Sequence, residues 1–337
     1  MDINSFITKK EHYGCIFESS ERPFVVAFGV NKKFFPPLGI LLTSMVLNNP
    51  SPLSIHIGCS EIDASDLERL RSFTEMHENI SITLYYVDTE ALLNYVGRKN
   101  PAAAYYRIIM ANVLYPAVDK LLYMDVDTLF IGKFSQFATL DLEGNAFMAV
   151  EDTLSGASLK DHKKELGLSE KDRYFNSGVM YIDLKKWHEA SLSEKVLDLL
   201  HQRAVGLRNF AFMDQGAMNI AGAGLWKPLP VQFNMMIPIL RERFYGKLPD
   251  DTVIIHYAGA YKPWKGTTGS EKQELLNQCI EISLFHYYRA KSLWRDFEGY
   301  DKSYRTVRLI SRWMWQKGNS FLALKWYVKY LLAKFGK

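Results

Sequence analysis

Cysteine is scarce in this chain, and its few copies form no recognisable pattern. Three cysteines occur among 337 residues, at Cys15, Cys59 and Cys279. An odd number of cysteines separated by long stretches provides neither a disulfide framework nor the closely spaced pairs of a zinc site. The cysteine content therefore favours a protein that works in a reducing compartment.

Long apolar segments are also missing. Residues 1–10 contain no apolar run of the kind that a secretory signal peptide has, so we expect no exported precursor. No run of about 18 apolar residues occurs, so we expect no membrane-spanning helix. Internal repeats and low-complexity segments are absent too. The length and the 48% hydrophobic content predict one large globular domain, alone or with an appendage.

Strand and helix signals alternate through the first part of the chain. Residues 1–22 are polar and unpatterned, which predicts a loose arm. Short apolar runs predict buried strands at residues 24–28, 53–57, 80–87 and 120–130, and helical patterns lie between them at residues 38–49, 60–77 and 105–115. This alternation predicts an α/β fold of the nucleotide-binding type, with a mainly parallel central sheet and right-handed crossovers.

The later part of the chain is less regular. We expect strands at residues 145–151, 174–184 and 253–255, an amphipathic helix at residues 185–201 and a helix that starts near residue 213. Residues 153–173 are polar and rich in glycine, serine and lysine, which predicts a mobile lid.

Two carboxylates, Asp125 and Asp127, close the apolar run at residues 120–124. Positions i and i+2 of a strand point the same way, so these side chains can converge on one ligand. Carboxylates at the C-terminal end of a parallel strand face the crevice where open α/β sheets bind ligands, and their oxygens suit Mg²⁺ or Mn²⁺. A solvated Asp-x-Asp turn is the alternative, and the motif alone does not decide between them.

Five stretches in one order resemble glycosyltransferase family 8. They are YR at 106–107, YMDVD at 123–127, YFNSG at 174–178, DQ at 214–215 and HYAGAYKPW at 256–264. The nearest resemblance is to bacterial enzymes that add α-linked galactose or glucose to the lipopolysaccharide core. It implies a GT-A fold, a UDP-sugar donor, Mn²⁺ and retention of anomeric configuration.

The resemblance assigns roles at the donor diphosphate. It implies that Asp125, Asp127 and His256 bind the metal, and a histidine ligand favours Mn²⁺ over Mg²⁺, which stays possible but weaker. Gly259 would let the backbone approach the phosphates, while Lys262 would neutralise the β-phosphate as UDP leaves. The implied donor site also includes Val126 and Arg107, the latter reaching the sugar and diphosphate.

Further residues match positions around the transferred sugar. Asn176 and Asp152 match positions that bind donor-sugar or acceptor hydroxyls, Asp214 would bind sugar hydroxyls, and Gln215 would lie near the anomeric carbon. The expected catalytic residues are Gln215, Asp214, Asp152, Arg107 and Lys262. Retention can arise by double displacement or by a front-face, ion-pair route. An amide is a poor nucleophile, so we favour the front-face route, in which Gln215 stabilises an oxocarbenium-like state.

The nucleotide end departs from the family pattern, which often has Asp-x-Asn followed by Tyr or Phe. Here Asn31, Lys33 and Phe34 stand at these positions. Phe34 keeps a ring near the base, and Asn31 can still bond to uracil without the charge. Lys33 in place of asparagine leaves the base and ribose contacts open.

The last residues differ in charge from the rest. The chain carries +4 in total, and residues 301–337 hold nine Lys or Arg and one acid, so this segment is +8 and the remainder −4. Basic and aromatic residues can bind nucleic acid, but no RNA or DNA module occurs, so we expect no nucleic-acid partner. We expect part of the tail to pack on the body and part to bind an anionic membrane surface.

These patterns predict three segments: an arm at 1–22, a GT-A catalytic domain at 23–270 and a helical region with the basic tail at 271–337. The expected partners are a UDP-sugar, a lipid-linked core oligosaccharide and the inner-leaflet surface. The expected location is the cytoplasm, at the cytoplasmic face of the inner membrane. The sugar, glucose or galactose, and the linkage, 1,2 or 1,3, stay open.

Other classes of protein have weaker support. The run from Asp125 also resembles the first motif of haloacid-dehalogenase phosphatases, but that motif normally lies on the first strand of its domain. A glycogen-type self-glucosylating starter and a non-catalytic sugar-nucleotide or glycan-binding protein are further alternatives. Retention of both aspartates, His256, Lys262 and the Asp214–Gln215 pair argues against the last of these.

Overall fold

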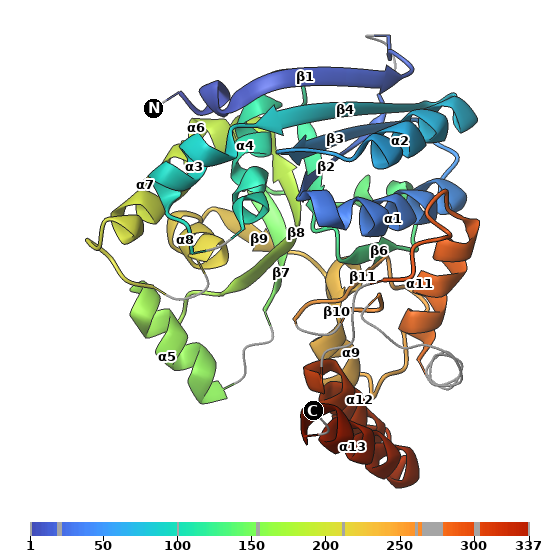
Figure 1. The fold of residues 1–337 in the computed structure, drawn as a ribbon. Helices are drawn as coiled ribbons and strands as arrows, with labels where there is room; N and C mark the ends of the chain where they lie inside the picture. The colour runs from blue at the N-terminus through green and yellow to red at the C-terminus, as the bar shows by residue number, and fades with distance from the viewer. Residues whose placement is uncertain are drawn as a thin grey trace.

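The computed structural model describes residues 2–18, 22–99, 101–152, 156–210, 213–259, 262–264, 279–299 and 304–335. The strands of a large sheet are β1 (Ile7–Gly14), β2 (Phe24–Val30), β3 (Leu53–Cys59), β4 (Ile80–Val87), β5 (Lys120–Met124), β7 (Phe147–Glu151), β8 (Phe175–Asp183) and β9 (Trp226–Pro228). A small sheet contains β6 (Thr128–Phe130), β10 (Met235–Met236) and β11 (Ile254–His256). The strand orders are β1-β4-β3-β2-β5-β8-β7-β9 and β10-β11-β6 (Figure 1).

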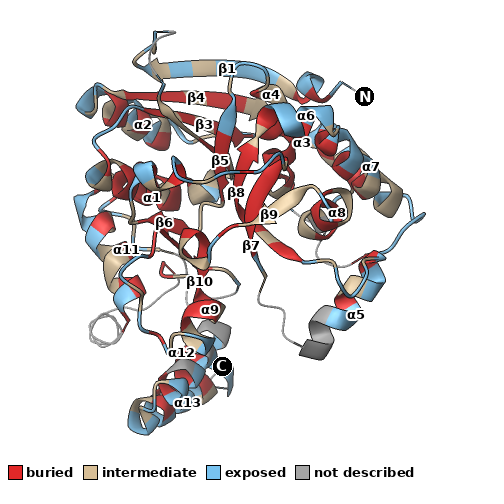
Figure 2. Ribbon diagram, turned by 180° about the vertical axis from the view of Figure 1, so that it is seen from behind, coloured by how far each residue is buried: buried red, intermediate tan, exposed pale blue. Residues whose placement is uncertain are grey.

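The parallel core of the large sheet is the one that the alternating pattern predicts. Strands β4, β3, β2 and β5 pair in parallel, whereas β8 is antiparallel to both β5 and β7. Their apolar residues are buried on both faces, as Ile55 and Leu122 illustrate, which explains why these strands appear as continuous apolar runs (Figure 2).

Helices cover the two faces of the large sheet (Figure 1). One apolar cluster contains residues of α1 (Phe35–Asn48), α2 (Ala64–Met76) and α11 (Ile280–Lys291). The other contains residues of α3 (Thr89–Val96), α4 (Tyr106–Val113), α6 (Leu184–Glu189), α7 (Leu192–Ala204) and α8 (Met213–Ala221). The single helix expected at 185–201 is two helices, because Ser191 adopts a left-handed conformation with φ +51° between them.

Short elements complete the connections between these layers. They are the helix α9 (Ile237–Glu242) and the 3₁₀ turns Ile3–Phe6, Lys32–Phe34, Ala102–Tyr105, Phe134–Phe137 and Val231–Asn234. Within the segment 153–173, which we expect to form a lid, residues 156–166 form the helix α5 (Gly156–Leu166). Residues 153–155 lie outside the described part of the chain, and lid motion stays a prediction.

The expected loose arm at residues 1–22 is wrong over most of its length. Strand β1 pairs antiparallel with β4 along the edge of the large sheet, from the Ile7–Val87 pair to the Gly14–Ser81 pair. No residue of this strand is buried, so it lacks the apolar run that would mark it in the sequence. Its hydrogen bonds use the backbone, whose capacity to pair does not depend on side-chain polarity.

The C-terminal residues form a hairpin of two helices, α12 (Tyr304–Gln316) and α13 (Ser320–Phe335), that projects from the body (Figures 1 and 2). We call it the tail hairpin. Its buried apolar side chains form one cluster with the start of α11: Cys279, Ile282, Val307, Ile310, Met314, Ala323, Trp326 and Tyr330. Across the described residues, no helix combines the length and the apolar character that crossing a bilayer requires. The expected domain boundary near residue 270 falls outside the described residues.

Candidate active site and metal centre

The two acids lie where the chain passes from the large sheet to the small one. Strand β5 ends at Met124, and β6 begins at Thr128, directly after Asp127. Thr128 pairs with His256, the last residue of β11, in the antiparallel ladder of the small sheet. This register brings one ligand atom each of Asp125, Asp127 and His256 within 4.8 Å of one another.

A buried asparagine orients the histidine. Asn234 is fully buried, and its Oδ1 lies 2.9 Å from Nδ1 of His256. The Nδ2 of Asn234 donates to Oδ1 of Asn176 at 3.1 Å, so its Oδ1 is the atom left to accept a proton from Nδ1. That bond leaves Nε2 of His256 directed at Asp127, whose Oδ1 is 3.4 Å away. An imidazole whose other nitrogen is held by an outer partner in this way is a common metal ligand. No motif in residues 220–250 marks Asn234, so sequence reasoning missed it.

The electrostatics of the two carboxylates differ. Burial by itself would raise the pKa of Asp127, but Lys262 and His256 hold it well below its usual range. Burial raises the pKa of Asp125, an effect that Arg107 opposes and the like charge of Asp127 reinforces. Two partly buried carboxylates beside a buried imidazole nitrogen form a donor set that fits a divalent cation such as Mn²⁺, which accepts both oxygen and nitrogen ligands. Asp125, Asp127 and His256 are therefore the residues that can hold a metal.

Arg107 joins the acids to the sugar side of the site. The guanidinium is 7% exposed, and its Nη2 lies 2.8 Å from Oδ1 of Asp125. Its Nε lies 3.5 Å from Oδ2 of Asp214, and Nη1 donates to Oγ of Ser177 at 2.7 Å. These contacts place Arg107 as a buried counter-charge for two carboxylates. The implied contact with the donor stays a prediction.

Gln215 lies at the centre of a hydrogen-bond network. Its Oε1 accepts from the backbone N–H of Ser177 at 3.2 Å and from Nδ2 of Asn176 at 3.3 Å. Its Nε2 donates to Oδ2 of Asp152 at 2.9 Å and to the hydroxyl of Tyr174 at 3.0 Å. Residues from three separate stretches of the sequence, at positions 152, 174–177 and 215, thus meet around one amide. Neighbouring Asp214 is partly buried, and this desolvation raises the pKa of its carboxyl, while Arg107 acts in the opposite direction.

Gly178 leaves room for this arrangement. A Cβ at this position would lie 2.3 Å from Cε1 of His256 and 3.0 Å from Oδ2 of Asp125. The backbone carbonyl of Gly178 also accepts the N–H of Asp125 at 2.7 Å. The glycine of the YFNSG stretch is therefore required because strand β8 passes directly behind the acids.

The residues expected to bind the nucleotide base include a buried polar atom that no described residue pairs with. The Oδ1 of Asn31 is buried and has no hydrogen-bond partner among the described residues, while Lys33 is exposed. The ring of Phe34 lies edge-on against Trp264, with centroids 6.1 Å apart. A buried, unsatisfied acceptor of this kind is a suitable partner for an N–H group of a base.

Lys262 and Gly259 are the residues expected to bind the donor phosphates, and Lys262 contacts Asp127 directly. Its Nζ donates to Oδ2 of Asp127 and, at 2.6 Å, to the backbone carbonyl of Tyr257. Gly259 is exposed with φ +86°, a left-handed conformation that glycine adopts without strain. Among the described residues, apart from its chain neighbours, no atom would lie within 4 Å of a Cβ at Gly259. Backbone here is open to a ligand, while residues 260–261 lie outside the described chain.

Comparison with solved structures identifies the fold of the chain. The structure of the galactosyltransferase LgtC in complex with donor and acceptor sugar analogues has a TM-score of 0.65 and 19% identity, over 81% of this chain and 99% of that one. The apo structure of the bifunctional glycosyltransferase WbbM has a TM-score of 0.65 and 20% identity, over 84% of this chain and 52% of that one. The fold is the GT-A fold of glycosyltransferases, as the sequence predicts.

Sequence comparison then defines the family. The model of glycosyl transferase family 8 matches residues 25–268, and the chain belongs to this family. It is 32% identical over 254 residues to a lipopolysaccharide 1,2-glucosyltransferase of Escherichia coli K12, covering 71% of this chain and 72% of the relative. It is 26% identical over 260 residues to a lipopolysaccharide 1,3-galactosyltransferase of Salmonella typhimurium, covering 75% and 76%. The family match assigns the acid motif to a glycosyltransferase rather than to a phosphatase.

Proposed function

We propose that this protein is a retaining hexosyltransferase that moves glucose or galactose from a UDP-sugar to a hydroxyl of a lipopolysaccharide core oligosaccharide. The observation that carries the proposal is the convergence of Asp125, Asp127 and His256 beside the Gln215 network. Relatives named as lipopolysaccharide glucosyl- and galactosyltransferases support the choice of sugar and acceptor. The donor sugar and the linkage stay open, and assays with a panel of UDP-hexoses distinguish them.

The metal of the proposed reaction is Mn²⁺, held by Asp125, Asp127 and His256. When bound, it would supply positive charge to the donor diphosphate as UDP leaves. Lys262 contacts Asp127, so its ammonium is close enough to the acids to share that neutralising role. Asn31 and Phe34 would hold the uracil base, and the open backbone at Gly259 would approach the phosphates.

The proposed route is front-face displacement with retention. The Gln215 amide carries no charge and no readily lost proton, so it is a poor nucleophile. Its oxygen is directed by the bonds to Ser177 and Asn176, and a fixed carbonyl dipole stabilises developing positive charge at the anomeric carbon. Asp214 and Asp152 would hold sugar or acceptor hydroxyls. Trapping a covalent glycosyl–Gln215 adduct during turnover would refute this route.

We further propose that the tail hairpin binds the anionic cytoplasmic face of the inner membrane. Large apolar side chains that stay exposed on the tail hairpin support this: Trp315, Phe321, Leu324, Leu332 and Phe335 are 63–78% exposed. Exposed Arg308, Arg312, Lys325 and Lys334 lie on the same two helices. Apolar and basic groups together are what an interfacial helix presents to acidic lipid.

Vesicle co-sedimentation tests the membrane proposal. We expect binding to phosphatidylglycerol-containing vesicles that weakens with salt, and loss of binding for Phe321→Ser combined with Leu332→Ser. Ile16→Ser removes an equally exposed apolar group at the other end of the chain and serves as the control. Equal binding by the double variant and the control refutes membrane attachment. Self-association measured by light scattering would assign the surface to a second copy instead.

A panel of UDP-hexoses, Mn²⁺ and truncated core oligosaccharides tests the enzymatic proposal. We expect transfer of one hexose with retained configuration, and a loss on the order of 1,000-fold for Asp127→Asn because a metal ligand is removed. The matched control is Asp161→Asn, an exposed aspartate on α5. UDP-sugar binding without transfer would identify a binding protein, and sugar attached to the protein itself would identify a self-glucosylating starter.

A further inference from the structure

The hydrogen-bond network of Gln215 continues outward to helix α5 through two side chains. The hydroxyl of Tyr174, which accepts from Nε2 of Gln215 at 3.0 Å, lies 3.1 Å from Nε2 of His162. Tyr174 is 3% exposed and His162 is 5% exposed, so water does not compete for these bonds. A buried chain of polar groups therefore connects a helix outside the sheet to the proposed reaction centre.

The direction of each bond in this chain follows from the chemistry of the groups. An amide NH₂ only donates, and Nε2 of Gln215 directs its two hydrogens to Asp152 and Tyr174. Since the oxygen of Tyr174 accepts, its own O–H is available to donate, and the acceptor within reach is Nε2 of His162. His162 must then be neutral and carry its proton on Nδ1, which lies 3.9 Å from Oε2 of Glu165. Burial lowers the pKa of His162, which favours this neutral form.

Two donors, Ser177 and Asn176, and two acceptors, Asp152 and Tyr174, together fix which end of the Gln215 amide faces each neighbour. A flipped amide would direct NH₂ at two donors, the backbone N–H of Ser177 and Nδ2 of Asn176, and would direct its oxygen at the Asp152 carboxylate. We propose that Tyr174 and His162 are positioning residues that hold the oxygen of Gln215 toward the transferred sugar. The inference rests on the proposed role of Gln215 at the anomeric carbon.

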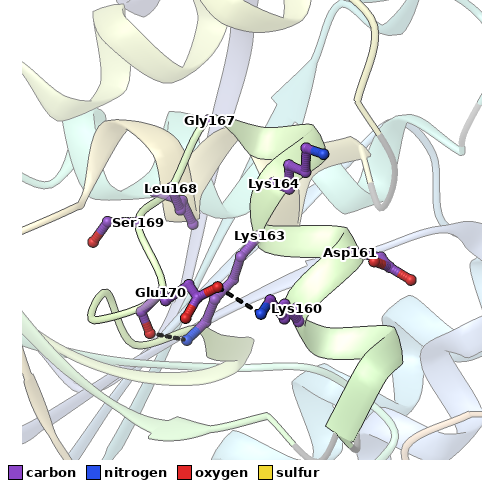
Figure 3. Close-up of a pocket in the computed structure, with 8 residues that line it drawn as sticks. All are labelled: Lys160, Asp161, Lys163, Lys164, Gly167, Leu168, Ser169 and Glu170. Carbon is purple, nitrogen blue, oxygen red and sulfur yellow. Dashed lines mark hydrogen bonds and ion pairs between the residues drawn. The ribbon is translucent and has the colours of Figure 1, made fainter.

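Several polar side chains of α5 are exposed instead: Lys160, Asp161, Lys164 and Glu165. Figure 3 shows Lys160, Lys163 and Lys164 beside a groove of about 770 Å³ that the turn after α5 closes, where Lys160 pairs with Glu170 at 2.7 Å. His162 is absent from the lining of this groove and is buried against Tyr174, whose ring centroid is 5.0 Å from its own. Among the described side chains of α5, His162 is the one bonded to the Gln215 network.

The first test separates positioning from general stability. We expect Tyr174→Phe to lower kcat about tenfold while the donor KM stays within about twofold, because orientation at the reacting atom is lost but binding is kept. Tyr85→Phe is the matched control, since the hydroxyl of Tyr85 also bonds a histidine, His56, at 3.0 Å in the same sheet. Equal kcat values for the two variants would overturn the proposal.

A second pair of variants tests the histidine. Glutamine can accept the Tyr174 O–H through its side-chain oxygen, whereas leucine cannot. We expect His162→Leu to reproduce the loss in Tyr174→Phe and His162→Gln to stay within about threefold of the unmodified enzyme. Equal losses in both His162 variants, with equal melting temperatures, would assign His162 a packing role only.

Nuclear magnetic resonance of ¹⁵N-histidine-labelled protein gives a readout that needs no activity. We expect the His162 signals, assigned by their disappearance in His162→Gln, to show the Nδ1–H tautomer and to change in Tyr174→Phe. A cationic or Nε2–H imidazole at neutral pH would overturn the hydrogen-bond chain. If the tautomer is as expected and no UDP-sugar is turned over, the proposed function fails while the structural connection stands.

Discussion

Gly178 occupies a position where the site tolerates a hydrogen atom and no larger group. A Cβ there would lie 2.3 Å from the His256 ring, which is itself held by Asn234 and cannot move without breaking that bond. We expect Gly178→Ala to keep the fold but to lower transfer and Mn²⁺ affinity about 100-fold, because the third ligand is displaced. Titration calorimetry with Mn²⁺ and the transfer assay measure both effects.

The control for this substitution is Gly58→Ala on strand β3. Its Cβ would meet the flexible Met110 side chain, with Sδ at 3.2 Å, instead of a ligand. We expect near-normal metal affinity in that variant. Equal affinities in Gly178→Ala and Gly58→Ala would show that the His256 ring is not confined as the structure indicates.

Asn234 acts on the metal centre through a single hydrogen bond. Removing its amide frees Nδ1 of His256 and allows the ring to rotate or change tautomer. Because loss of such an outer partner typically weakens a metal site, we expect Asn234→Ala to lower Mn²⁺ affinity about 10- to 100-fold. Asn79→Ala is the control, since it removes an amide that also makes one hydrogen bond, to the Pro50 carbonyl at 2.7 Å, but touches no candidate ligand. An unchanged affinity in Asn234→Ala would mean that His256 is positioned by its strand alone.

At the scale of elements, helix α11 carries a buried acid at the junction with the tail hairpin. Glu281 is in the first turn of α11 and is fully buried, and neither carboxylate oxygen has a hydrogen-bond partner among the described residues. Burial raises the pKa of Glu281 above its ordinary value of 4.5, with Lys317 and Arg241 acting in the opposite direction. Ionising this group is therefore harder in the folded protein than in the unfolded chain.

The raised pKa of Glu281 makes the folded protein less stable as the pH rises. Below about pH 4 both states are protonated and Glu281 has no differential effect; as pH rises, the unfolded chain ionises first and the folded state loses relative stability. We expect Glu281→Gln to raise the free energy of unfolding at pH 7 by on the order of 1 kcal/mol and to have no effect near pH 4. Thermal melts of this variant and of the exposed Glu75→Gln measure it, and a destabilised Glu281→Gln at pH 7 would contradict the prediction.

At the scale of the whole molecule, the candidate metal site joins two sheets. Asp125 follows β5 of the large sheet, while His256 ends β11 of the small one. A cation that binds the folded state alone stabilises it, by about 2.7 kcal/mol at 100 times its Kd. We expect Mn²⁺ to raise the melting temperature, EDTA to reverse this and Asp127→Asn to abolish it. A similar Mn²⁺ shift in Asp127→Asn and unmodified protein would place the cation elsewhere.

Local patterns in the sequence determined much of the architecture. Continuous apolar runs mark β2, β3, β4 and β5 because strands covered on both faces admit few polar residues. The ordered motifs around Asp125, Asp127 and His256 identified the family and named residues that the fold brings together. The spacing of apolar residues in the last segment also predicted helices, as observed in the tail hairpin.

Only the tertiary structure decided the contacts that cross the chain. The edge strand β1 is specified by backbone bonds to β4, and Asn234 and the Tyr174–His162 chain are specified by partners 12 to 41 residues away. Such hydrogen bonds have no sequence period, because any polar residue can make them once folding has brought the partner within 3 Å or so. The three residues that can hold a metal were named from the sequence, and the fold brings them together; the residues that orient them required the folded chain.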